Sequence, residues 1–108
     1  MKGDHCGEFE ELVLLVVHAL GTDAHRASVR RLLERETTRS ISTGAVYAAL
    51  ERLEHKGLVI SAIHAGATTI GGRRRKVFTL SIVGTRTLAS LRRLRTRLYH
   101  ARPARARA

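Results

Sequence analysis

The sequence predicts a mainly α-helical fold with one small β-hairpin, arranged as a winged helix-turn-helix followed by a C-terminal helix. Three observations support this prediction. Hydrophobic residues recur at helical spacing in three segments of the first half of the chain. Two segments rich in β-branched residues follow, with glycines between them, and a last segment repeats leucine at helical spacing. We therefore expect a winged helix-turn-helix domain at 1–82, a dimerisation helix at 83–100 and a disordered basic tail at 101–108.

The first helix is predicted over residues 8–20. The run 12–17 alone also fits a buried strand, because β-branched residues favour strands. The acidic start of the segment favours a helix, whose N-terminus attracts negative charge, and Gly21 is expected to end it. The expected apolar face consists of Phe9, Leu12, Val13, Val16 and Leu20.

The second helix is predicted over residues 24–36, with Thr22 or Asp23 as its N-cap. Polar residues 37–40 connect it to the next helix, so the two helices have the order of a helix-turn-helix. The expected inward residues of the second helix are Ala24, Val29, Leu32 and Leu33.

The third helix is predicted over residues 42–56 and has a clear start and end. Ser42 is the expected N-cap, and Ile41 and Val46 have the spacing of a hydrophobic staple. The end resembles a Schellman motif, in which a left-handed glycine precedes a hydrophobic residue that contacts the last turn. The residues expected in this motif are Leu53, Gly57 and Leu58.

Small and hydroxylic residues occupy the exposed start of this third helix, and they allow another surface to come close. Hydroxyls and backbone N–H groups at such a start bind phosphates, and they contact base edges when the helix enters a major groove. The alternative is that these are ordinary cap and surface residues. The residues of this region that we expect to contact DNA are Arg39, Ser42, Thr43, Gly44 and Tyr47.

Two strands are predicted after the third helix, at residues 58–64 and 75–81, with Lys76, Phe78 and Leu80 on one face of the second strand. The wing between them, residues 65–76, ends in four consecutive cations. Arginine suits contact with a minor groove or its flanking phosphates, whereas the alternative is a solubilising loop. The wing cations expected to contact DNA are Arg73, Arg74, Arg75 and Lys76.

Charge is unevenly distributed along the chain. The net charge is +11, and residues 55–108 hold thirteen Lys or Arg and no acidic residue. A half-chain without acids indicates a polyanionic partner, and double-stranded DNA is the partner we expect. On charge alone, an RNA-binding or ribosome-associated module, or a protein that binds an anionic membrane surface, remains an alternative.

No arrangement of residues indicates catalysis. The chain lacks a phosphate-binding loop and a dinucleotide fingerprint, and its six histidines are scattered, so we expect no enzyme activity, metal or cofactor. Cys6 is the only cysteine, which excludes an internal disulfide and leaves either an inert thiol or a redox role. The longest apolar run is too short for a membrane span, and we expect a soluble, cytoplasmic protein without membrane association.

The predicted C-terminal helix, residues 83–99, carries a narrow leucine stripe among basic and small residues. Such a stripe suits a coiled-coil-like seam, and it favours a homodimer that binds the two half-sites of a palindromic operator. Alternatively, the helix folds back on its own domain. The expected interface residues are Leu88, Leu91, Leu94 and Leu98.

Three segments resemble the PadR family of transcriptional regulators. These are GEFEELVLLVVHALG at 7–21, SISTGAVYAALERLEHKGLV at 40–59 and GGRRRKVFTLSIVG at 71–84, and the middle one is the most specific. The resemblance implies a homodimeric winged helix-turn-helix, usually a repressor, with a C-terminal dimerisation helix. It also implies DNA contacts at Ser42, Thr43, Gly44, Tyr47 and Arg73–Lys76.

The chain departs from the family pattern at three points. His25 and Arg26 stand where the family often has a Tyr-Gly pair, and Val83 replaces a frequent proline. Effector pockets of related proteins are aromatic, whereas this chain has only two Tyr and two Phe. The sequence therefore points to no particular small-molecule effector.

Overall fold

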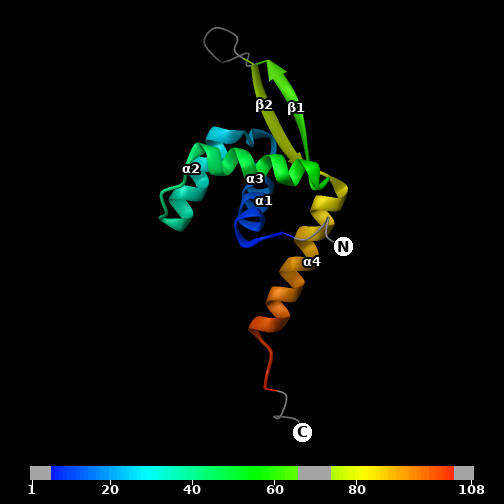
Figure 1. The fold of residues 1–108 in the computed structure, drawn as a ribbon. Coiled ribbons are helices and arrows are strands. Elements are labelled where there is room, and N and C mark those ends of the chain that lie inside the picture. Colours follow the sequence, from blue (N-terminus) through cyan, green and yellow to red (C-terminus); the bar gives the residue numbers. More distant parts are fainter. Residues whose placement is uncertain (1–5, 66–73, 104–108) are drawn as a thin grey trace.

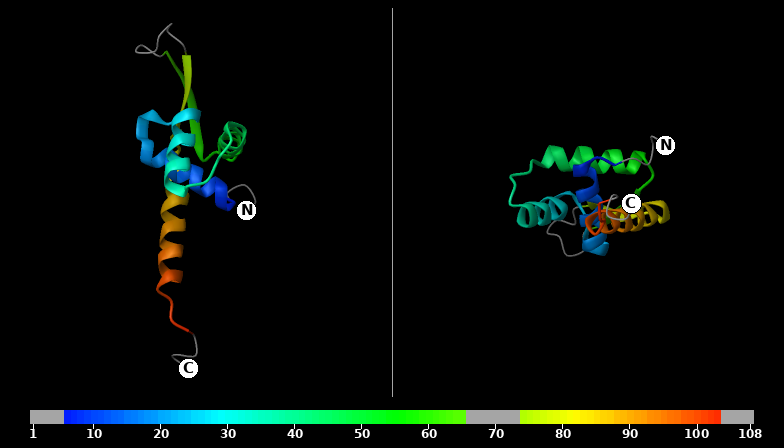
Figure 2. Two further views of the ribbon diagram at one scale, coloured as in Figure 1. Left: turned by 90° about the vertical axis from the view of Figure 1, so that its left-hand side faces the viewer. Right: turned by 90° about the horizontal axis from the view of Figure 1, so that it is seen from below.

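The computed structural model describes residues 6–65 and 74–103. Its described part confirms the predicted winged helix fold, with the hairpin projecting from one end and the last helix from the other (Figures 1 and 2). Residues 66–73 of the expected wing and 104–108 of the expected tail lie outside the described residues. The elements are α1 (Glu8–Leu20), the 3₁₀-helix η2 (Gly21–Asp23), α2 (Arg26–Thr37), α3 (Thr43–His55), β1 (Val59–Ala65), β2 (Arg74–Leu80) and α4 (Ile82–Tyr99).

Helix α1 is the centre of the fold and contacts α2, α3, β2 and α4. Its predicted bounds are confirmed, but its buried face differs from the expected stripe. Leu14 and Val17 are almost fully buried, whereas Phe9, Leu12 and Leu20 are only partly buried. The reason is that elements cover α1 from several sides, so its buried surface is wider than the single face that helical periodicity predicts.

Two carboxylates of α1 hold the neighbouring helices in place. Glu10, which is buried, accepts hydrogen bonds from Arg52 Nε at 2.5 Å and from Lys56 Nζ at 2.6 Å, both near the end of α3. Burial raises the pKa of Glu10, but the hydrogen bonds and charges of Lys56 and Arg52 outweigh burial and lower it below its ordinary value. Glu11 binds both Nε and Nη2 of Arg95 on α4, at 2.6 and 2.5 Å.

The predicted start of α2 is wrong. Gly21, with a φ of 61°, leads into the 3₁₀ turn, and the helix begins at Arg26 with His25 as its N-cap. The His25 ring accepts a hydrogen bond from the Ser28 N–H at 3.4 Å, and Ser28 Oγ accepts one from the His25 N–H at 2.9 Å. Histidine is not among the preferred N-cap residues, so the sequence pattern did not indicate this reciprocal cap.

The segment before α2 also anchors the hairpin. The Phe78 N–H on β2 donates to the Ala24 carbonyl at 2.8 Å, and Arg75 Nη1 lies 3.1 Å from His25 Nε2. Burial lowers the pKa of His25, as do the positive charges of Arg75 and Arg31, although Asp23 acts in the opposite direction. The folded chain therefore favours a neutral imidazole at this position.

The start and end of α3 are confirmed as predicted. Ser42 Oγ accepts the Ala45 N–H at 3.0 Å, and Ile41 is buried together with Val46. At the other end, the Leu58 N–H donates to the Leu53 carbonyl at 2.9 Å, and Gly57 has a φ of 79°. These features define a Schellman motif.

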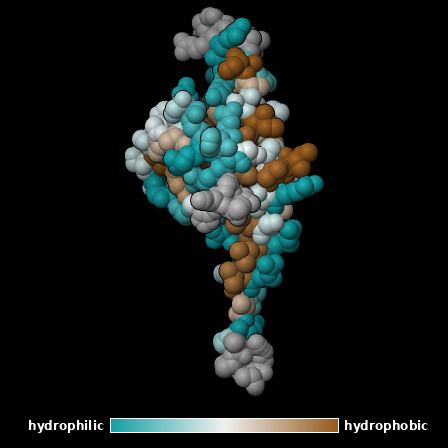
Figure 3. Space-filling view, turned by 45° about the vertical axis from the view of Figure 1, so that its right-hand side comes forward, coloured by the Kyte–Doolittle hydropathy of each residue, from teal (hydrophilic) through white to brown (hydrophobic). Residues whose placement is uncertain are grey.

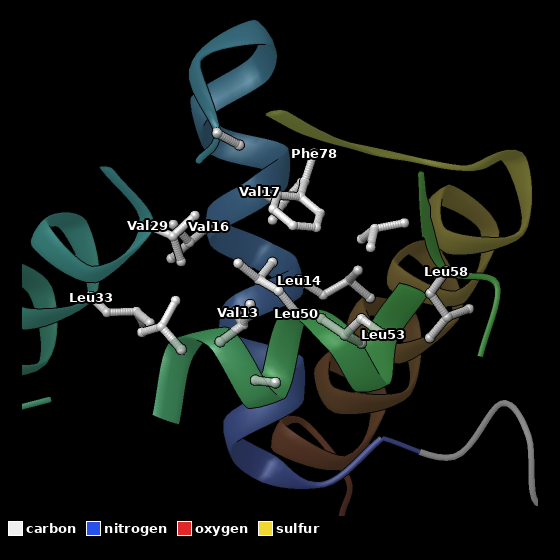
Figure 4. Packing of buried hydrophobic residues seen from close by; sticks show 14 of the residues in the cluster. Val13, Leu14, Val16, Val17, Val29, Leu33, Leu50, Leu53, Leu58 and Phe78 are labelled. Atoms are coloured by element: carbon white, nitrogen blue, oxygen red, sulfur yellow. The ribbon is translucent and has the colours of Figure 1, made fainter. Parts of the chain in front are cut away.

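The buried face of α3 packs on α1. Figure 4 shows the side chains of Leu50 and Leu53 on α3 beside Leu14 of α1, within one cluster of aliphatic residues. Phe78 from β2 is the one aromatic residue of the buried cluster in the described part of the chain. This packing, together with the salt bridges of Glu10, fixes the direction of α3 relative to the rest of the domain.

The two strands pair antiparallel from Val59 opposite Leu80 to Ala65 opposite Arg74, each shifted by one residue from its predicted range. The Lys76 ammonium lies 5.6 Å from the centre of the Phe78 ring, as expected for residues on one face. Val77 on the other face is buried as well, so β2 is covered on both sides in its middle.

The start of α4 is held against the end of α3. Ser81, the N-cap of α4, accepts the Gly84 N–H and donates its hydroxyl to the Gly57 carbonyl at 2.7 Å. The Ser81 N–H donates to the Leu58 carbonyl at 3.0 Å. Gly84 packs so closely on this carbonyl that a Cβ at this position would lie 2.0 Å from the oxygen.

Within the described residues, no helix is long and apolar enough to span a lipid bilayer.

We predict that Gly84→Ala lowers the free energy of unfolding by about 1–3 kcal/mol, because the new methyl group meets backbone that cannot rotate away. The matched control is Gly44→Ala on α3, where a Cβ meets only Ser42 Oγ, at 4.0 Å. This control should be unchanged or more stable, because alanine favours helix formation. Urea denaturation of both variants measures the difference, and equal stabilities would contradict the close packing of α4 on the Leu58 carbonyl.

We also predict that stability depends on the protonation of His25. The unfolded chain binds a proton at this residue near its ordinary pKa of 6.5, whereas the folded chain resists protonation. The contribution of neutral His25 is therefore fully present above pH 6.5 and is lost as the pH falls below it. Between about pH 8 and about pH 5.5, the free energy of unfolding measured with urea should fall more for the wild type than for His25→Asn, which keeps a capping side chain. An equal fall in both proteins would show that protonation of His25 does not affect stability.

Candidate nucleic-acid interface

The start of α3 presents an open polar surface. Ser42, Thr43 and Gly44 are exposed, and the nearest atom to a Cβ built at Gly44 lies 4.0 Å away. Tyr47, one turn further on, leaves 43% of its surface exposed. Another molecule can therefore approach the backbone of the first helical turn closely, as the sequence predicts.

Arg26, at the start of α2, packs against this surface. Its guanidinium carbon lies 5.1 Å from the centre of the Tyr47 ring, a distance at which a cation and an aromatic face attract each other. The contact places a positive charge of α2 beside the exposed start of α3. Arg26 was not among the predicted site residues, although His25 and Arg26 stand where the sequence departs from the family pattern.

The cations of the predicted wing have different surroundings. Arg74 and Arg75 are exposed on β2, and Arg75 contacts His25. Lys76 is partly buried and lies 3.7 Å from a carboxylate oxygen of Glu51 and of Glu54 on α3. Its charge is therefore partly compensated within the chain. Arg73, the fourth predicted cation, lies outside the described residues.

A basic hollow of about 410 Å³ lies where these elements meet. One predicted residue of α3 and three of β2 line it, together with residues around the start of α2 that were not among the predicted site residues. No described residue that lines this hollow carries a carboxylate. Its lining is formed by His25, Arg26, Ala27, Arg30, Thr43, Arg74, Arg75 and Lys76.

Four described residues of the predicted set do not line the basic hollow: Arg39, Ser42, Gly44 and Tyr47. Arg39, in the connection before α3, is 3.7 Å from a carboxylate oxygen of Glu8. Ser42 uses its hydroxyl oxygen as the N-cap acceptor of α3. The structure therefore divides the predicted set into residues that line the hollow and residues beside it on α3 and on the α2–α3 connection.

The leucine stripe of α4 also divides into two parts. Leu88 is 9% exposed and belongs to the core of its own chain, whereas Leu94 and Leu98 are 41% and 65% exposed. Figure 3 shows hydrophobic residues along the projecting part of α4. A second hollow of about 400 Å³, lined mainly by apolar surface, lies between α1 and α4 and includes Leu15 and Leu91. The apolar surface of this end therefore extends from α4 onto α1.

Comparison with known proteins identifies the family of this fold. The model of the transcriptional regulator PadR-like family matches residues 13–90. No curated protein sequence matches the chain at a significant level.

Several solved structures are similar to the chain. A PadR family transcription regulator from Clostridium difficile R20291 has 25% identity and a TM-score of 0.67, over 86% of this chain and 91% of that one. A PadR-like transcription factor from Bacteroides fragilis has 21% identity and a TM-score of 0.69, over 84% and 82%. A PadR-like transcriptional regulator from Bacillus cereus shares the fold at 16% identity, with a TM-score of 0.63 over 87% and 93%.

The open start of α3, the basic hollow beside it and the winged helix fold agree with the family match, which covers most of the chain. The chain belongs to the PadR-like family of transcriptional regulators.

Proposed function

We propose that this protein is a homodimeric repressor that binds a palindromic DNA operator through α3 and the β1–β2 wing. The observation that carries the proposal is the position of the basic hollow. Cations of α2 and β2 flank the exposed first turn of α3, and no carboxylate lines the surface between them in the described part of the chain. A DNA duplex that receives α3 in its major groove would bring phosphates toward these cations.

In this proposal the start of α3 makes the base contacts. Thr43 offers a hydroxyl, Gly44 allows close approach, and Tyr47 offers a ring and a phenolic hydroxyl. Few of these groups distinguish one base pair from another. Specificity is therefore expected to depend also on groove shape, on the wing and on the spacing of two half-sites.

The wing strand contributes the electrostatic part of the affinity. Arg74 and Arg75 are exposed and lie beside no carboxylate of the described residues, so their charge is available to phosphates or to a minor groove. Each neutralised phosphate releases counterions, and the affinity should therefore fall steeply with salt.

The dimer is proposed to form through α4. Leu94 and Leu98 lie one turn apart and are exposed on a helix that projects from the domain. A second copy of the helix would cover them, and the Glu11–Arg95 contact would fix the angle at which both helices leave their domains. Two α3 helices related by the dimer axis would then enter successive half-sites, and the bound dimer would block access to the promoter.

We predict that Tyr47→Ala and Arg74→Ala each weaken binding to the operator about tenfold, which corresponds to about 1.4 kcal/mol. Tyr47→Ala should mainly reduce the preference for the operator over unrelated duplex. Arg74→Ala should weaken binding to all duplexes and reduce the salt dependence by about one phosphate. Fluorescence anisotropy with a duplex selected from random oligonucleotides measures both effects.

The matched control for these variants is Arg35→Ala, since Arg35 is exposed on α2 but does not line the hollow. Its affinity should be close to that of the wild type. Structured RNA serves as the competitor in the same assay. Unchanged affinity of both test variants, or preferential binding of the RNA, would refute the proposed DNA surface.

For the dimer, we predict that Leu94→Glu combined with Leu98→Glu converts the protein to a monomer that keeps its fold. Both leucines are exposed within one chain, so the new carboxylates disturb only a contact between chains. Sedimentation velocity measures the mass and circular dichroism checks the helices. Arg93→Glu, which adds a carboxylate on another side of the same helix, is the control and should remain dimeric. A dimeric double variant would place the interface elsewhere.

A further inference from the structure

The basic hollow contains more positive charge than the chain itself compensates. Arg30 lies 3.1 Å from Glu34, and Lys76 lies near Glu51 and Glu54, so both have acidic partners. Arg26, Arg74 and Arg75 have none within the described residues. Three guanidinium groups from two different elements therefore line the same concave surface without a counter-charge.

The His25 ring fixes the position of one of these guanidinium groups. His25 is 7% exposed, and Arg75 Nη1 lies 3.1 Å from its Nε2. A neutral imidazole brings no negative charge to this contact, and the Asp23 carboxylate lies 3.7 Å from Nε2, too far for a good hydrogen bond. The charge of Arg75 is therefore available to a ligand in the hollow.

We propose that the basic hollow is a specific phosphate site, in which Arg26, Arg74 and Arg75 bind the oxygens of one phosphate group. The planar guanidinium groups suit this role, because each can donate two parallel hydrogen bonds to a phosphate. Thr43 adds a hydroxyl from the start of α3. The site thus joins α2, α3 and β2 through the ligand.

The phosphate can come from the backbone of bound DNA or from a free phosphorylated compound. The hollow is open to solvent and, at about 410 Å³, is large enough for a small phosphorylated compound. A free phosphorylated compound in the hollow would displace the DNA phosphate, so it would reduce the affinity for the operator. The DNA source rests on the function proposed above, whereas the free source does not.

The first experiment uses inorganic pyrophosphate and the full chain without DNA. Isothermal titration at constant ionic strength should show saturable binding that weakens at least tenfold in Arg26→Gln and in Arg74→Gln. Both residues have exposed side chains, and circular dichroism checks that the variants fold. Arg35→Gln, which removes a cation outside the hollow, should bind pyrophosphate like the wild type.

The second experiment uses operator duplexes in which single backbone phosphates are replaced by neutral methylphosphonates. One position in each half-site should weaken wild-type binding about tenfold, yet have little further effect on Arg26→Gln, because the variant has already lost that contact. Such coupling identifies the DNA backbone as a source, and pyrophosphate binding that depends on Arg26 and Arg74 identifies a free one.

Either result supports a phosphate site in the hollow. If neither pyrophosphate binding nor methylphosphonate coupling depends on Arg26 or Arg74, the proposal is overturned. If the wild type binds no operator, the function proposed above fails, and the pyrophosphate titration alone decides whether the hollow is a phosphate site.

Discussion

The fold depends on the backbone around Leu58, where α3, β1 and the start of α4 meet. The Leu58 N–H closes the end of α3, and its carbonyl accepts the Ser81 N–H that precedes α4. Gly84 packs on the same carbonyl, and β1 begins at the next residue. The helix proposed to enter the DNA groove, the wing and the helix proposed to dimerise therefore meet at the same few backbone groups.

Two adjacent carboxylates of α1 act together with this junction. Glu10 holds the last turns of α3, and Glu11 holds the middle of α4 through Arg95. Both acids are nearly buried, so removal of their partners would leave a charge with poor solvation. Because Arg52 and Arg95 are more than half exposed, the net stabilisation by their ion pairs is expected to be small, and the main effect of the pairs is to orient α3 and α4. With α1 at the centre, the angle between α3 and α4 is set by packing and by these two residues.

The sequence predicted most of the fold because the relevant signals are local. The cap at Ser42, the Schellman motif at Gly57 and the hydrophobic periodicity each depend on residues within a few positions of one another. The start of α2 was predicted wrongly for the same reason. His25 acts as a cap only because Ser28 forms the reciprocal hydrogen bond and the chain turns at Gly21. The buried face of α1 was misplaced because helical periodicity does not show how many neighbours a helix has.

By itself, the sequence determined the element order, the location of the positive charge and the candidate residues at the start of α3 and on the wing. Only the tertiary structure decided which cations lie together. Arg26 and Arg75 are far apart in the chain, yet both line the basic hollow, whereas Arg39 pairs with Glu8. Likewise, Leu88 belongs to the core while Leu98 is exposed, although one helical stripe contains both. The physical reason is that charge compensation and burial depend on contacts between elements, which spacing along one element cannot specify.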